Sequence, residues 1–227
     1  MSLDIPHIRA ICFDVDGTLS DTDDQFVHRI ERFFSLFKFL FRDQNPRPLA
    51  RKVVMFSESP GNFLISIPDK LRIDEELAAI GDYFYRKGHK KSGSFLLIAG
   101  VINMLSMLNQ QYPMSIVSAR GERSTQIFLN QFKLNQYFQC IAAAHTCEHT
   151  KPFPDPIIWA AKEMQVRPDE CLMIGDTVVD IHAAKAAGAQ SVGVLCGFGE
   201  EKELRKAGAD LILESTALLT DILLPNI

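Results

Sequence analysis

The sequence predicts an α/β fold in which a parallel sheet carries helices on both faces. Short apolar segments alternate with amphipathic ones along residues 96–227, and an apolar run at residues 8–13 precedes them. Such alternation is typical of parallel sheets, because each return to the same strand direction needs a crossover. Residues 20–95 lack this alternation. We therefore expect a two-part chain, with a mainly helical domain inserted after the first strand.

Strands are expected where short apolar segments are bounded by polar residues or glycine. The first covers residues 8–13 and ends abruptly at Asp14. Five more are predicted at residues 114–117, 139–143, 171–174, 191–194 and 210–213. These six segments would form the sheet.

Amphipathic segments between these strands predict the helices. They cover residues 100–110, 124–132, 156–164, 179–187 and 200–207. Pro156 can open its helix, since the first helical turn needs no amide donor at that position. Gly188 and Gly208 stand where two of the helices should end.

Residues 20–95 are expected to form a helical cap domain, and residues 1–19 and 96–227 the core. Because the insertion begins directly after the first strand, it would overhang the end of that strand like a lid. The cap contains a basic cluster, which we interpret as a solvated helix face, with contact to an anionic substrate as the alternative. The cluster consists of Arg42, Arg47, Arg51 and Lys52.

The composition is ordinary for a water-soluble protein. The 227 residues are 47% hydrophobic and carry a formal net charge of −4, which argues against nucleic acid as the main ligand. No secretory signal is recognised, and the most hydrophobic stretch, residues 33–41, is too short to span a bilayer. The five cysteines are odd in number and widely spaced, which favours a reducing compartment. We expect a cytoplasmic monomer or homodimer that binds neither nucleic acid nor membrane.

Asp14 and Asp16 directly follow the first predicted strand and precede Gly17 and Thr18. Open α/β sheets bind their ligands at the carboxyl ends of strands. Two close carboxylates need a cation or a shared proton, and a divalent metal accepts such oxygen ligands. A carboxylate beside the metal can attack phosphorus. The pair predicts a metal-assisted covalent site, with a simple polar turn as the alternative.

Three further signals should lie at the same edge of the sheet. Ser118 follows the second core strand, and its hydroxyl could hold a phosphoryl oxygen. Lys151 opens a proline-rich segment that would fix its ammonium group. Asp176 and Asp180 follow another strand at a spacing that can bring them to one side. The structural alternatives are a turn cap for Ser118, a surface charge for Lys151 and a helix N-cap for Asp176.

Together these residues closely resemble the four motifs of the haloacid dehalogenase superfamily. The first motif, Asp-x-Asp-Gly-Thr-Leu, stands at residues 14–19, and the second ends in Ser118. The third is Lys151 of Lys-Pro-Phe-Pro-Asp-Pro, and the fourth, Gly-Asp-x-x-x-Asp, stands at residues 175–180. The resemblance covers the predicted core and looks closest to the branch of phosphoglycolate phosphatases and β-phosphoglucomutases. It implies a Rossmann-like core with a helical cap.

The resemblance also implies a role for each motif residue. Asp14 would be the nucleophile that forms an aspartyl-phosphate, while Asp16 would protonate the leaving oxygen and then deprotonate water. Mg²⁺ would be held by Asp14, Asp176 and the main-chain carbonyl of Asp16. Asp180 would support the site or hydrogen-bond Lys151. The residues expected to contact the phosphate or the substrate are Gly17, Thr18, Ser118, Ala119, Arg120 and Lys151.

The expected activity is hydrolysis of a small phosphorylated metabolite, such as phosphoglycolate or a sugar phosphate. Asp16 favours phosphate esters, because the resemblance implies that the haloalkanoate dehalogenases and the phosphonate-cleaving members of the family lack an aspartate at this place. A phosphosugar mutase is the alternative within the family, and a phosphometabolite-binding module with little turnover is the alternative outside enzymes. Arg120 could reach a second anionic group of the substrate or a carboxylate of the cap.

Overall fold

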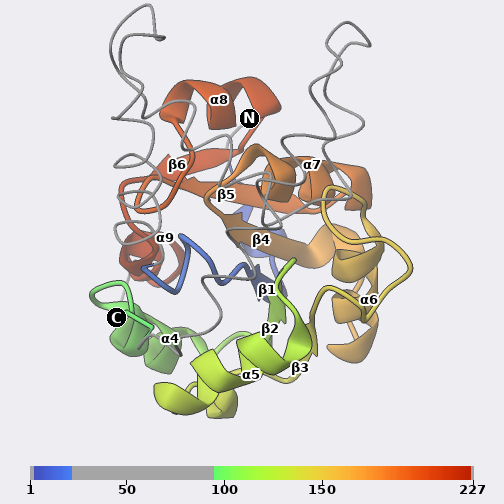
Figure 1. The fold of residues 1–227 in the computed structure, drawn as a ribbon. Coiled ribbons are helices and arrows are strands. Elements are labelled where there is room, and N and C mark those ends of the chain that lie inside the picture. The colour runs from blue at the N-terminus through green and yellow to red at the C-terminus, as the bar shows by residue number, and fades with distance from the viewer. Residues whose placement is uncertain (1–2, 22–94, 226–227) are drawn as a thin grey trace, which may run out of the picture. The chain divides into compact units, whose positions relative to one another are not determined.

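The computed structural model describes residues 3–21 and 95–225, which belong to one compact unit (Figure 1). The fold and the site are built from these residues. The expected cap lies almost entirely outside them, together with its basic cluster. The cap and the domain boundaries therefore stay predictions.

A six-stranded parallel sheet forms the centre of the described unit. Its strands are β1 (Ala10–Phe13), β2 (Met114–Val117), β3 (Cys140–Ala142), β4 (Cys171–Gly175), β5 (Gln190–Val194) and β6 (Leu211–Leu213). They lie in the order β3-β2-β1-β4-β5-β6, and each neighbouring pair is parallel. The chain runs outward from β1 through β2 to β3, and then crosses to β4 on the other side of β1. The predicted Rossmann-like fold is confirmed, and β1 stands beside its switch point.

The register brings the predicted site residues to one edge of the sheet. Phe13, the last residue of β1, lies opposite Ile116 of β2 and Ile174 of β4. Asp14 continues this pairing, because its amide donates to the carbonyl of Ile174 at 2.9 Å. The turns after β1, β2 and β4 therefore emerge together.

Alternate side chains of β1 enter two separate hydrophobic clusters, one on each face of the sheet. Ile11 and Phe13 pack with residues of α4, α5 and α9, whereas Ala10 and Cys12 pack with residues of α6 and α7. Figure 1 shows α6 and α7 across the sheet from α4 and α9. The helices are α4 (Val101–Leu108), α5 (Glu122–Gln131), α6 (Asp155–Glu163), α7 (Val178–Ala187), α8 (Glu201–Ala207) and α9 (Leu219–Leu223).

The predicted elements match these bounds closely, with two differences. The first strand begins at Ala10 rather than residue 8, because Ile5–His7 form a 3-10 turn that leads into it. Helix α9 was not predicted, since a five-residue helix is too short to show a periodic pattern.

Two observations bear on the predicted setting of the protein. All five cysteines are thiols. Among residues 3–21 and 95–225, no helix has both the length and the apolar character that crossing a bilayer would need.

Candidate active site

Asp14 and Lys151 form the centre of the site. Asp14 directly follows β1 and is 6% exposed, while Lys151 lies in the loop before α6 and is 3% exposed. The Lys151 ammonium donates to Asp14 Oδ1 at 2.7 Å and to Asp180 Oδ1 at 2.6 Å. The surface-charge alternative for Lys151 is therefore wrong, and the expected contact with Asp180 is present.

Burial and charge act in opposite directions on these groups. Burial raises the pKa of Asp14 to about 7, although Lys151 works against the rise and the neighbouring carboxylates of Asp180 and Asp16 add to it. Burial alone would lower the pKa of Lys151, but the charges of Asp14 and Asp180 outweigh it and leave that pKa raised. Lys151 is therefore an ammonium at neutral pH, and a further positive charge would favour the ionised form of Asp14.

Three carboxylates of the site could share a metal ion. Asp14, Asp176 and Asp180 are all buried, and each offers an oxygen within 4.8 Å of the others. Lys151 is the only fully buried cation of residues 3–21 and 95–225. With all three carboxylates ionised, their three negative charges and the one positive charge of Lys151 leave a net charge of −2, which a divalent cation would balance. Hard oxygen donors of this kind fit Mg²⁺.

Asp176 is surrounded closely by backbone. The amide of Phe198 donates to Asp176 Oδ2 at 2.6 Å, and the glycines around it leave no room for side chains. A Cβ at Gly17 would lie 2.3 Å from Asp176 Oδ2, and one at Gly197 would lie 2.2 Å from it. Gly17 also has a φ of +70°, which favours glycine. The loop after β5 thus helps to fix the carboxylate, a role that the sequence reasoning missed although its Gly-Phe-Gly pattern marks a close approach.

Asp180 is oriented by the start of helix α7. The amide and hydroxyl of Thr177 donate to Asp180 Oδ2 at 3.0 and 2.7 Å, while Asp180 Oδ1 accepts from Lys151. Thr177 is the N-cap of α7, so the alternative that Asp176 caps this helix is wrong. Gly175 allows the close packing, because a Cβ there would lie 2.2 Å from Asp180 Cγ.

Ser118 and Arg120 follow β2 at the same edge. Ser118 is 3% exposed, and its Oγ accepts the amide of Arg120 at 3.2 Å. The turn contact that is the structural alternative for Ser118 is thus present, and the hydroxyl can still donate its hydrogen to a phosphoryl oxygen. The Arg120 guanidinium binds both carboxylate oxygens of Asp16, with Nε to Oδ2 at 2.9 Å and Nη2 to Oδ1. This partner was not predicted, although both residues follow neighbouring strands.

Thr18 is fully buried beneath the site. Its carbonyl accepts the hydroxyl of Thr216 at 2.6 Å, and its own hydroxyl has no hydrogen-bond partner among the described residues. The thiol of Cys196 contacts the same region, at 3.5 Å from the carbonyl oxygen of Gly17 and 3.4 Å from the Thr216 hydroxyl. These contacts hold the turn that carries Asp14 and Asp16.

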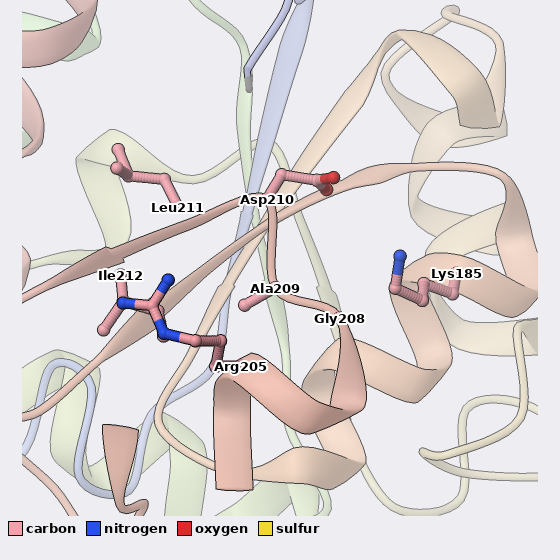
Figure 2. Close-up of a pocket in the computed structure, with 7 residues that line it drawn as sticks. All are labelled: Lys185, Arg205, Gly208, Ala209, Asp210, Leu211 and Ile212. Atoms are coloured by element: carbon pink, nitrogen blue, oxygen red, sulfur yellow. The ribbon is translucent and has the colours of Figure 1, made fainter. Parts of the chain in front are cut away.

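A pocket of about 440 Å³ lies at the opposite edge of the sheet, where β6 begins. Figure 2 shows Lys185 and Arg205 on either side of the segment from Gly208 to Asp210, with their charged ends well apart. Asp210 is engaged with β5, since its Oδ2 accepts the amide and hydroxyl of Ser191 at 2.9 and 3.1 Å. Charges that do not converge on one point give this pocket no catalytic arrangement.

Known proteins resemble this chain over nearly its whole length. A pyrophosphatase named PpaX from Anoxybacillus flavithermus is 28% identical over 217 residues, which cover 96% of this chain and 97% of that protein. A phosphoglycolate phosphatase from Neisseria gonorrhoeae is 30% identical over 212 residues, covering 88% and 85%. The crystal structure of a hydrolase from Pseudomonas syringae superposes with a TM-score of 0.67 at 26% identity, covering 94% and 97%.

The family profile described as haloacid dehalogenase-like hydrolase matches residues 11–194. This span begins within β1 and ends with β5, so it includes Asp14, Ser118, Lys151 and Asp180. The resemblance that the sequence motifs indicated is thereby confirmed: the chain is an enzyme and belongs to the haloacid dehalogenase-like hydrolase family.

Proposed function

We propose that this hydrolase is a Mg²⁺-dependent phosphatase that cleaves small phosphate esters through an aspartyl-phosphate on Asp14. The observation that carries the proposal is the buried Lys151 ammonium between Asp14 and Asp180, beside Asp176. The names of the relatives, a pyrophosphatase and a phosphoglycolate phosphatase, support small phosphorylated substrates.

The reaction divides into two displacements at phosphorus. Asp14 attacks, the bond from phosphorus to the leaving oxygen breaks, and Asp16 supplies the proton that this oxygen takes up. Water then attacks the phosphorus of the aspartyl-phosphate while Asp16 accepts a proton from the water. The bond between phosphorus and Asp14 breaks, phosphate is released, and the Asp14 carboxylate is regenerated. One carboxyl group can serve both steps, because donating a proton in the first step leaves Asp16 as the carboxylate that accepts a proton in the second.

The other residues stabilise charge on the transferring group. Lys151 and the Ser118 hydroxyl lie at the edge where the phosphoryl oxygens would sit, and they would neutralise or hydrogen-bond them. We expect backbone groups of Gly17, Thr18 and Ala119 to contact the same oxygens. Asp14, Asp176 and the carbonyl of Asp16 would hold Mg²⁺, which when bound supplies further charge neutralisation. Asp180 acts through Lys151, which it positions.

The test is phosphate release from a panel of phosphoglycolate, pyrophosphate, sugar phosphates and an aryl phosphate, with and without Mg²⁺. Asp14→Asn should lower turnover by about 10⁴-fold, because an amide cannot act as the nucleophile. Asp169→Asn makes the same change at a half-exposed carboxylate before β4 and should leave turnover unchanged. Acid quenching during turnover should trap a protein heavier by one phosphoryl group in the wild type and not in Asp14→Asn.

Each other result of this experiment points to a different function. Magnesium-dependent turnover in Asp14→Asn would exclude the nucleophile assignment. A phosphosugar isomer formed with little free phosphate would identify a mutase, and no turnover of any ester would favour a binding module.

The setting proposed for this activity is the cytoplasm, where the five thiols would stay reduced. We propose a monomer or homodimer whose ligand is a small phosphorylated metabolite, with neither nucleic acid nor membrane as a partner.

A further inference from the structure

The ion pair between Asp16 and Arg120 engages the residue proposed to exchange protons with the substrate. Asp16 follows β1 and Arg120 follows the neighbouring β2. Two guanidinium nitrogens reach both carboxylate oxygens, and both side chains are 12% exposed. This two-point geometry is the strongest form of an arginine–carboxylate contact.

Arg120 is held in place from several sides. Its guanidinium carbon lies 4.8 Å from the centre of the Phe95 ring, a distance at which a cation and a ring attract. The side chain of Gln131 bonds the backbone of Phe95 in both directions, at 2.9 and 3.3 Å, and Phe128 packs edge-on against its ring. The carbonyl of Arg120 accepts the amide of Ala144 at 3.1 Å. The position of the guanidinium is therefore fixed by the surrounding ring and backbone contacts.

The contact has a consequence for the proposed reaction. A carboxyl group that passes a proton to a leaving oxygen must direct one of its oxygens at the substrate, whereas both oxygens of Asp16 face Arg120. When Asp16 turns, Arg120 gives up two charge-assisted hydrogen bonds in a largely buried place, so an acceptor that takes the place of Asp16 is favoured. A carboxylate or phosphate on the substrate offers the same pair of oxygens in the same geometry.

We propose that Arg120 is a positioning and specificity residue that holds Asp16 before the substrate binds and then transfers to a second anionic group of the substrate. The preferred substrates are then phosphate esters whose leaving group carries a carboxylate or a further phosphate close to the ester oxygen. The closeness follows from geometry, because Arg120 lies one hydrogen bond from the group that serves this oxygen. This inference rests on the proposed phosphatase function and narrows its substrate class.

The test compares two substrates that differ only in charge, phosphoglycolate and phosphoglycolamide, whose neutral amide has the shape of the carboxylate. The wild type should prefer phosphoglycolate in kcat/KM by about tenfold or more, the usual range for a charge-assisted contact. Arg120→Met should bring the ratio of the two kcat/KM values close to one. Arg123→Met removes an exposed arginine three residues along and should preserve the wild-type ratio. A merely structural role for Arg120 would lower both substrates alike and leave the ratio unchanged.

The outcomes separate this inference from the function beneath it. Absence of phosphate release by the wild type from both substrates and from the wider panel would exclude the phosphatase itself. Turnover without a preference for the anion in the wild type would overturn the role of Arg120, whether or not the variant folds. Retention of the preference in folded Arg120→Met, checked by its melting temperature, would overturn it as well.

Discussion

The two edges of the sheet, where the strands end and where they begin, place charged side chains in opposite environments. At the carboxyl edge, Lys151 is buried and contacts two buried carboxylates. At the amino edge, Lys185 and Arg205 border a pocket but are exposed, and their charged ends point apart (Figure 2). A pocket lined by charged residues is therefore not in itself a catalytic site. A catalytic site needs charged groups that are buried by the fold and that converge on one point.

The largest effect should come from removing the buried ammonium. Lys151→Met leaves Asp14 and Asp180 buried without their cation, so it should cost about 3–5 kcal/mol of unfolding free energy and most of the activity. Lys185→Met at the other edge should change stability by less than about 0.5 kcal/mol. Chemical denaturation and phosphate release measure both. Equal losses in the two variants would contradict the contrast between the edges.

The next effect concerns pH and stability in the presence of a chelator. Folding raises the pKa of Asp14 from an ordinary value near 3.8 to about 7, so the folded state binds a proton that the unfolded state releases. This group therefore favours folding below about pH 4 and loses that contribution as pH rises to about 7. Asp14→Asn should be more stable than the wild type near pH 8, by up to about 4 kcal/mol, and the gain should shrink toward pH 4.

Denaturation curves of the two proteins at several pH values would show this trend. The control is Asp169→Asn at the amino edge, a half-exposed carboxylate. A gain for Asp14→Asn that does not vary with pH would count against burial as its cause.

A smaller effect should follow from crowding Asp176. In Gly197→Ala, the new Cβ would meet Asp176 Oδ2 at 2.2 Å, so the carboxylate or the loop must shift. We expect a loss of about 2 kcal/mol in stability and a weaker stabilisation of the protein by added Mg²⁺. Gly121→Ala meets no atom within 4 Å and has no positive φ, so it should behave like the wild type. Thermal melts with a Mg²⁺ titration test the pair, and unchanged Mg²⁺ stabilisation in Gly197→Ala would separate this loop from the metal ligands.

Much of the fold was predictable because each strand is a short apolar run that ends at a polar or small residue. Asp14, Ser118 and Asp176 mark such ends, and parallel pairing then brings them to one edge. The contact between Asp16 and Arg120 was not predictable in the same way. It depends on the lateral order of strands, and nothing in the local sequence of β1 states that β2 lies beside it.

Other features were missed for different physical reasons. The loop after β5 contacts Asp176 through the backbone amide of Phe198 and through closely packed glycines, and backbone contacts leave little trace in a pattern of side chains. Helix α9 is stabilised by burial of Leu219 and Leu223 rather than by a repeating pattern of its own. The predicted cap lies almost entirely outside the described residues.

The central place of β1 has a consequence for biosynthesis. The strand made first pairs with β4 through contacts such as Ala10 with Cys171, so its second neighbour is translated only when most of the chain exists. Contacts between such distant residues slow folding, because a long loop must close before they form. Until then the chain lacks Asp176 and Asp180, which follow β4. A ribosome-bound chain that stops before β4 would therefore carry the nucleophile without these two carboxylates. Phosphatase activity should arise only late in synthesis.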